Sequence, residues 1–189
     1  MKKLLIASAI SAGLLGASVA HAETGSVLDN WQENAYGQAK LGFTDMGLSD
    51  SAMTITGVAG LKTPSIHPML SFEADLTFTV TDAETSVSSM AGNTKVTASA
   101  FSLGAYAVAS YDQLSIENLV PYVRAGLGYT SVEVKASNAF ASASADDSEI
   151  DLGLGAGVRY QINDQLGVLV DYTTISTLDT LNVGVQYSF

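Results

Sequence analysis

The stretch Leu181–Phe189, LNVGVQYSF, decides the fold. Its apolar and aromatic residues occupy every second position, and Asn, Gly, Gln and Ser lie between them. Alternate residues of a strand point to opposite faces, so the stretch predicts a strand with one apolar and one polar face. A soluble domain that ended on such a strand would expose an unpaired edge. A barrel that closes its last strand onto its first has no such edge, so the stretch predicts a transmembrane β-barrel.

Seven earlier stretches repeat this alternation. With the last stretch they predict an all-β fold, an eight-stranded antiparallel up-and-down transmembrane barrel over residues 35–189. In one stretch the alternation breaks near Ser131 and Val132, which predicts a bulge or the membrane rim. The eight candidates are residues 35–44, 53–62, 70–80, 96–111, 121–134, 151–160, 166–173 and 181–189.

Charged residues within these strands fall on the polar face, apart from Glu133 after the break. A charge facing lipid at mid-bilayer costs about 2–4 kcal/mol for Arg or Lys, so the apolar face is expected outside and the charges inside. The predicted lumen charges are Lys40, Glu73, Asp75, Arg124, Asp151, Arg159 and Asp171.

Positions counted along the strands predict how these charges pair. Glu73 is expected to pair with both arginines. Lys40 is expected to pair with Asp75 or Asp171. Buried charges need partners, and an eight-stranded barrel is just wide enough for side chains, so a packed plug is favoured over a gated ion path.

The composition agrees with an exported barrel. The chain has 189 residues, no cysteine and only 14% charged residues, with a formal net charge of −11. Loss of a leader that carries Lys2 and Lys3 changes this charge to −13 (−11 minus 2). So acidic a protein is not expected to bind nucleic acid.

The first 34 residues divide into two segments. Residues 1–22 combine a basic start, an apolar run and Ala20-His21-Ala22, which predicts a cleaved signal peptide and export. Residues 23–34 are mostly polar and predict a short periplasmic lead-in, in which Trp31 could lie at a membrane interface.

The links predict the two ends of the barrel. The longest ones, residues 81–95 and 135–149, follow odd-numbered strands, and such loops face outward in outer-membrane barrels. Both are expected to be solvated, mobile loops; the alternative is a surface for divalent cations, lipopolysaccharide or a cell-surface partner. Their acidic residues include Asp82, Glu84, Asp146, Asp147 and Glu149.

Two features invite a chemical interpretation that the sequence does not support. Gly153-x-Gly155-x-Gly157 lacks the helix start of a dinucleotide loop, so a strand is expected. His67 lies beside Pro68 in a predicted turn, with no cysteine available as nucleophile, so a turn residue is favoured over a catalytic one. We expect no enzyme activity, cofactor or metal.

Three strands resemble the small outer-membrane β-barrels of the OmpA/OmpX type. They read PYVRAGLGY at residues 121–129, LGLGAGVRY at 152–160 and NVGVQYSF at 182–189. The resemblance implies a Gram-negative outer membrane with its lipid and lipopolysaccharide, and folding by periplasmic chaperones and the barrel-assembly machinery. It also implies that Tyr187 and Phe189 belong to the assembly signal.

The resemblance implies no single activity, because fold does not determine function. A structural or surface-interaction role through the extracellular loops is expected, with an unknown surface ligand. The alternative is a small porin or channel for ions or small solutes.

Overall fold

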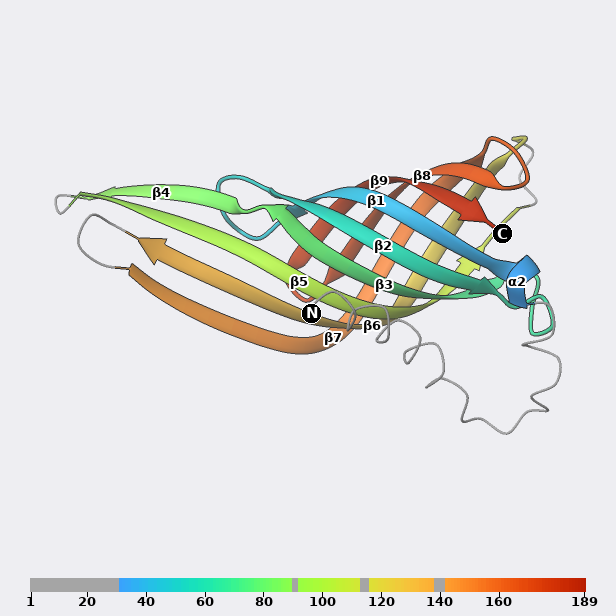
Figure 1. The fold of residues 1–189 in the computed structure, drawn as a ribbon, viewed down its shortest axis with the longest axis horizontal. Coiled ribbons are helices and arrows are strands. Elements are labelled where there is room, and N and C mark those ends of the chain that lie inside the picture. Colours follow the sequence, from blue (N-terminus) through green and yellow to red (C-terminus); the bar gives the residue numbers. More distant parts are fainter. Residues whose placement is uncertain (1–30, 90–91, 113–115, 138–141) are drawn as a thin grey trace, which may run out of the picture.

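The computed structural model describes residues 31–89, 92–112, 116–137 and 142–189. These residues form one short helix and nine strands (Figure 1). The elements are α2 (Trp31–Asn34), β1 (Ala35–Asp45), β2 (Ala52–Lys62), β3 (Leu70–Thr81), β4 (Ala83–Ser89), β5 (Gly92–Ser110), β6 (Leu119–Ser137), β7 (Ser142–Gln161), β8 (Leu166–Ile175) and β9 (Leu178–Ser188).

The strands close into a barrel. Neighbours pair antiparallel, and β1 pairs with β9, which joins the first strand of the chain to the last. β5 completes the ring by pairing with β3. β4 pairs with β5 further along the same side, so β3 and β4 share one position in the ring. The ring therefore has eight positions, which confirms the predicted eight-stranded antiparallel barrel.

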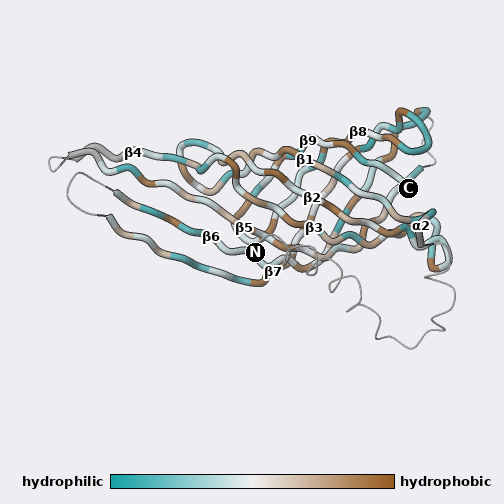
Figure 2. Tube along the Cα trace, viewed as in Figure 1, coloured by the Kyte–Doolittle hydropathy of each residue, from teal (hydrophilic) through white to brown (hydrophobic). Residues whose placement is uncertain are grey.

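The barrel wall is apolar outside and polar inside. On β1, Leu41 is 54% exposed and Phe43 is 58% exposed, whereas Lys40 beside them is only 2% exposed. Figure 2 shows hydrophobic and hydrophilic residues alternating along the barrel strands, as a period of two requires. Within the described residues, no helix is long and apolar enough to cross a membrane.

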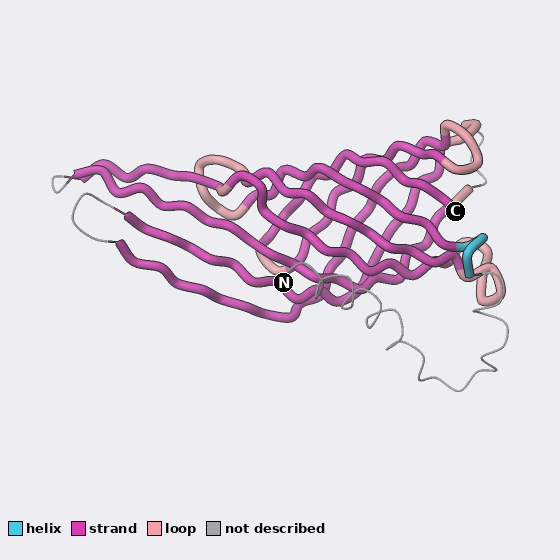
Figure 3. The backbone as a smooth tube through the Cα atoms, viewed as in Figure 1, coloured by secondary structure: helices cyan, strands magenta, loops and turns pink. Residues whose placement is uncertain are grey.

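Three strands run far beyond the ring at one end. β5 and β6 have 19 residues each and β7 has 20, about twice what a tilted strand needs to cross a bilayer. Their outer parts and β4 form a four-stranded extension (Figures 1 and 3). We call it the projecting sheet: β4, residues 92–99, residues 131–137 and residues 142–152.

The projecting sheet marks what we call the hairpin end of the barrel. The opposite end carries the links of residues 63–69, 111–118 and 162–165, and we call it the turn end. The last residue, Phe189, and helix α2 both lie at the turn end (Figure 1).

The structure corrects one sequence prediction and refines two others. Residues 81–95 and 135–149 are predicted above to be loops, but most of both segments forms strands, because backbone pairing within each hairpin holds them extended although Ala, Asp and Glu have low strand propensity. β6 stays in register with β5 and β7 past Ser131 and Val132, so the break in alternation marks the barrel rim and not a bulge. The link predicted at residues 174–180 is a tight turn between Ile175 and Leu178.

Candidate functional site

The polar interior of the barrel holds six buried charged residues contributed by five strands. Three are basic and three are acidic, so their formal charges balance. The residues are Lys40 on β1, Glu73 and Asp75 on β3, Arg124 on β6, Arg159 on β7 and Asp171 on β8.

Lys40 and Asp171 form the most enclosed ion pair. Nζ of Lys40 lies 2.6 Å from Oδ2 of Asp171, and both side chains are 1% exposed. Tyr122 Oη donates to the same carboxylate oxygen at 2.8 Å, and Asn182 Nδ2 donates to the other at 2.9 Å. These donors compensate the carboxylate for the water that it loses on burial.

Arg124 joins a second group of charges. Its Nη1 lies 3.0 Å from Asp75 Oδ2 and 3.5 Å from Glu73 Oε2. Its Nη2 donates to Thr173 Oγ1 at 2.9 Å. The guanidinium carbon also lies 4.2 Å from the centre of the Tyr106 ring, a cation–π geometry.

Glu73 connects this second group to the wall of β1. Its Oε1 accepts hydrogen bonds from Tyr36 Oη at 2.8 Å and from Gln38 Nε2 at 3.0 Å. Arg159 differs from the expectation: its Nη1 donates to Gln186 Oε1 at 2.9 Å, and no ion pair to a carboxylate is found for it within the described residues. Glu73 therefore pairs with one arginine, not with two.

Aromatic rings also occupy the interior, and glycines on other strands make room for them. A Cβ at Gly60 would overlap the ring of Tyr36, which is 3% exposed. A Cβ at Gly153 would lie 2.7 Å from Tyr106 Oη. The run Gly153-x-Gly155-x-Gly157 thus lies within strand β7, as the sequence predicted, where glycine permits the close approach.

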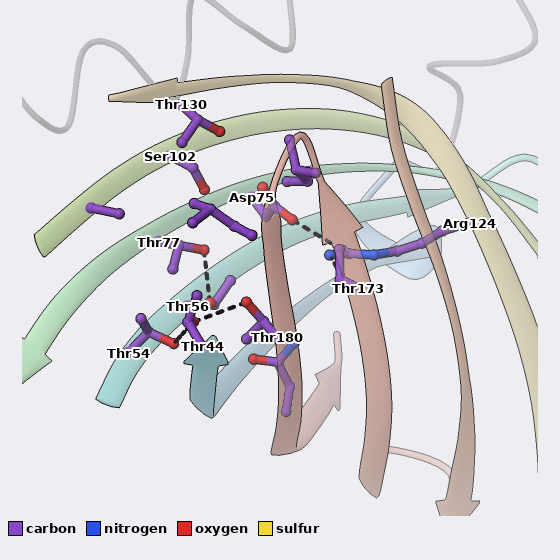
Figure 4. Close-up of a pocket in the computed structure, with 14 residues that line it drawn as sticks. Thr44, Thr54, Thr56, Asp75, Thr77, Ser102, Arg124, Thr130, Thr173 and Thr180 are labelled. Atoms are coloured by element: carbon purple, nitrogen blue, oxygen red, sulfur yellow. Dashed lines mark hydrogen bonds and ion pairs between the residues drawn. The ribbon is translucent and has the colours of Figure 1, made fainter. Parts of the chain in front are cut away.

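A small cavity of about 40 Å³ lies on the hairpin side of the ion pairs (Figure 4). Threonines from several strands surround it, and Arg124 and Asp75 lie at its border. Three buried oxygens near it have no hydrogen-bond partner among the described residues: Asp75 Oδ1, Thr130 Oγ1 and Asn182 Oδ1. A cavity of this size is large enough for water, which would satisfy these groups.

The other predicted residues lie apart from this network. Asp151 is partly exposed near the rim, opposite Gly128. His67 lies in the turn, where its Nδ1 accepts a hydrogen bond from the Met69 amide at 3.2 Å. Among the described residues, no group of three or more potential ligands could hold a metal ion.

The closing strand ends in an aromatic pair. The rings of Tyr187 and Phe189 meet edge to face with centroids 5.4 Å apart. Both side chains are largely exposed on the outside of the barrel. Their part in assembly stays a prediction. The side chain of Trp31 lies outside the described part of the structure.

Sequence reasoning found the charges but missed the neutral residues that satisfy them. All of these neutral residues lie on the polar face of a predicted strand, which was the available signal. Charge is conspicuous in a strand, whereas a buried Tyr or Gln looks like any polar residue until its neighbour across the lumen is known. The missed partners are Tyr36, Gln38, Tyr106, Tyr122, Thr173, Asn182 and Gln186.

The projecting sheet forms a second candidate site because it has open edges. β7 pairs with β8 only from Gly153 onward, so residues 142–152 have a paired strand on one side only; on the other side the single described hydrogen bond is from Ser176 Oγ to the Glu149 carboxylate. At the other edge, β4 pairs with β5 alone. Residues 142–150 are exposed on both faces of the sheet. Backbone N–H and C=O groups along such an edge are available to another strand.

The basic and the acidic side chains of the projecting sheet differ in whether they form ion pairs. Its two lysines are each engaged by a neighbouring acid: Lys95 lies 2.6 Å from Glu84, and Lys135 lies 2.9 Å from Glu133. The hydrogen bond from Lys135 to Glu133 raises the pKa of this lysine. The acids of the open β7 edge have no ion pair among the described residues. They are Asp146, Asp147, Glu149 and Asp151.

Several solved structures share this fold, and three from bacteria are the following. Neisserial surface protein A aligns with a TM-score of 0.58 at 21% identity, over 82% of this chain and 97% of its own. The attachment invasion locus protein Ail of Yersinia pestis, solved with the heparin analogue sucrose octasulfate, aligns with a TM-score of 0.51 at 13% identity, over 82% and 97%. The N-terminal barrel domain of Pseudomonas aeruginosa OprF gives 0.51 at 17% identity, over 84% and 98%.

Two comparisons of the sequence with known proteins gave different results. A comparison with curated proteins found no match. The family model described as "Outer membrane protein beta-barrel domain" matches residues 9–189, nearly the whole chain. The apolar outer wall and the charged interior are the arrangement that a lipid environment requires. The chain belongs to this family of outer-membrane β-barrel proteins.

Proposed function

We propose that this barrel serves as a surface-interaction protein, with a closed interior and a projecting sheet that binds an extended, basic polypeptide segment. The hairpin end faces the cell exterior, because outer-membrane barrels carry long loops outside and short turns toward the periplasm. The turn end, with α2 and Phe189, then faces the periplasm.

The open β7 edge carries this proposal. Residues 142–152 offer unpaired backbone groups to an incoming strand, which would extend the sheet. Residues 142–150 have both faces exposed, so the side chains of the incoming strand have room on either side.

The charge of the edge selects the partner. Asp146, Asp147 and Glu149 lie within four successive positions of the edge strand, and neither lysine of the sheet pairs with them. Electrostatic complementarity governs association rate and specificity, so an extended segment rich in Lys or Arg is favoured over an acidic one.

A binding experiment tests the proposal. The protein, purified from outer membranes into detergent micelles, is titrated with a fluorescent peptide of alternating Lys and Thr. We expect saturable binding that weakens with salt. The triple variant D146N/D147N/E149Q should bind about tenfold more weakly. Amide exchange in residues 142–152 should slow when the peptide binds.

Two controls separate edge pairing from general attraction. Asp164→Asn removes an acid from the turn end and should leave the affinity unchanged. A peptide of the same composition with alternating D-residues keeps the charge but cannot form a regular strand, and it should not protect these amides. Equal affinity in the triple variant, or no protection by the all-L peptide, would contradict the proposal.

A small channel is the second candidate. Cavities flank the ion pairs, one toward each end of the barrel, so a rearrangement of Arg124 would be needed to join them. We propose that the interior stays closed, because Arg124 engages Asp75, Glu73 and Thr173 together. Silence in single-channel recordings of folded protein supports closure. Steady openings that change in Lys40→Gln or Glu73→Gln would establish a pore.

We propose a cleaved signal peptide at residues 1–22, assembly by periplasmic chaperones and the barrel-assembly machinery, and contact with lipopolysaccharide around the hairpin end. We propose no catalytic role. Deletion of Phe189 tests the assembly signal, since loss of heat-modifiable barrel from outer membranes is expected.

A further inference from the structure

A second cavity of about 150 Å³ lies at the turn end of the barrel, away from the projecting sheet. Its wall combines two basic side chains with hydroxyl groups, and most of these point inward from the barrel strands. The residues are Tyr36, Lys62, Ser71, Ser110, Val120 and Arg159, with part of the turn before β3, Asp112 after β5 and the last residue of β7.

Arg159 is incompletely satisfied at this cavity. It is 9% exposed, and Nη1 donates to Gln186 Oε1 at 2.9 Å. Its Nε is buried with no hydrogen-bond partner, and no carboxylate pairs with it among the described residues. A buried guanidinium normally has an anion beside it, because a charge without one is poorly compensated for lost hydration.

Lys62 adds a second positive charge at the same cavity. It is the last residue of β2, is partly buried, and lies close enough to Arg159 for the two charges to repel one another. In the described part of the chain it has no ion pair. Two cations that share a cavity without a counter-ion favour binding of an anion.

The interior carboxylates do not fill this need. Asp171 is engaged by Lys40, and Asp75 by Arg124. Glu73 accepts from Tyr36 and Gln38 and lies beside Arg124. Asp112 is the one acidic residue that lines the cavity; it is exposed and forms no described ion pair with either cation.

We propose that this cavity binds a small oxyanion of the phosphate class, with Arg159 and Lys62 supplying charge and Ser71 and Ser110 supplying hydroxyl donors. Arginine and lysine beside hydroxyl groups are the donors that phosphate oxygens prefer. The inward orientation of Arg159, Ser71 and Lys62 favours a free anion over a lipid headgroup, which would approach from the outer wall. In the orientation proposed above, the anion would come from the periplasm.

Calorimetric titration tests the site with inorganic phosphate as the probe. Protein purified from outer membranes is studied in zwitterionic detergent micelles, and we expect saturable binding. Arg159→Gln and Lys62→Gln should each weaken binding at least about tenfold, as loss of a charged hydrogen bond predicts. Asp112→Asn should strengthen it, because a competing negative charge is removed.

The controls keep the outcome independent of folding and of lipid. Heat-modifiable mobility must show a folded barrel for each variant, and Lys62→Gln, at the end of a strand, remains informative if Arg159→Gln does not fold. Lys95→Gln, on the projecting sheet, should leave phosphate affinity unchanged.

Nanodiscs with and without phosphatidylglycerol distinguish the source of the anion. Competition by this lipid would assign the site to a headgroup and overturn the free-anion proposal. The proposal would be overturned if the unaltered protein did not bind phosphate, or if Arg159→Gln and Lys62→Gln both bound phosphate as tightly as the unaltered protein.

Discussion

Two ion pairs with the same separation show how differently the two regions of this molecule use charge. Lys40–Asp171 inside the barrel and Lys95–Glu84 on the projecting sheet both measure 2.6 Å. The first pair is 1% exposed on both sides, whereas the second is about half exposed. Coulomb attraction is stronger in the interior, but so is the cost of leaving either partner alone. The distance between the charged atoms therefore says little about what an ion pair contributes to stability until its burial is known.

Strand β7 makes the same contrast along one continuous backbone. From Gly153 onward it pairs on both sides, and outward Leu154 alternates with inward glycines. Before Gly153 it pairs only with β6, and both faces are exposed. In the barrel half, a one-residue slip would turn Arg159 toward the outer wall, so sidedness fixes the register. In the outer half, pairing with β6 has to hold the register with little help from burial.

Lys40→Met should have the largest effect on stability. It leaves Asp171 charged, buried and short of its cation, which costs about 3–5 kcal/mol. The free energy of unfolding in detergent, followed by urea and gel mobility, measures the loss. Adding Asp171→Leu removes the carboxylate that has lost its cation, so the double variant should regain part of the stability.

The exposed pair supplies the matched control for that experiment. Lys95→Met breaks a contact of equal length and should change stability by less than about 1 kcal/mol. Similar losses for Lys40→Met and Lys95→Met would show that burial does not separate the two pairs, and the comparison would fail.

A charge placed on each half of β7 should give the next largest difference. Leu154→Arg puts a guanidinium on the outer wall, opposite Ala125, and should destabilise the barrel by about 2–4 kcal/mol. Ala145→Arg places the same group on the projecting sheet, where water surrounds it, and should be nearly neutral. If both variants unfold at the same urea concentration, the lipid-facing assignment of Leu154 is wrong.

Two glycines of β2 allow a finer test of packing. Gly60→Ala forces a methyl group into the Tyr36 ring and should cost about 1–3 kcal/mol. Gly57→Ala adds the same methyl group on the outer face, where nothing lies within 4 Å, and should be neutral or slightly stabilising. Unfolding midpoints of the two variants, compared under one condition, decide between a filled and a loosely packed interior.

The barrel was predictable because lipid imposes a strict rule on each strand. Alternation at Leu181–Phe189 and at the seven other stretches identified the strand positions and which face turns inward. The projecting sheet was not predictable by the same rule, since water covers both of its faces and imposes no alternation. Residues such as Ala143, Ser144 and Ala145 therefore looked like loop, although pairing with β6 makes them strand.

The interior network was predictable only in outline. Alternation placed Lys40 and Asp171 on the same side of the wall, but their contact depends on how strands β1 and β8 lie across the lumen. The number of residues counted along a strand is only an approximate guide to which side chains meet across the lumen of a barrel, because tilt and stagger shift neighbouring strands. Arg159 shows the consequence: counting placed it level with Glu73, yet it contacts Gln186.

The smallest expected effect concerns Lys135, whose pKa is raised by its hydrogen bond with Glu133. A lysine with a raised pKa contributes stability that is fully present below the ordinary value of roughly 10.4 and is lost as pH rises through the higher folded value. Near neutral pH the pair should therefore add no pH dependence to the stability of the protein.

Glu133→Gln should lower the pKa of Lys135 toward its ordinary value, measured by NMR titration of the lysine side chain in nanodiscs at low salt. Glu84→Gln, which alters only the neighbouring pair, should leave the Lys135 titration unchanged. An unchanged Lys135 titration in Glu133→Gln would show that the contact is not maintained in solution, and the backbone pairing of β5, β6 and β7 would then have to hold the sheet together without it.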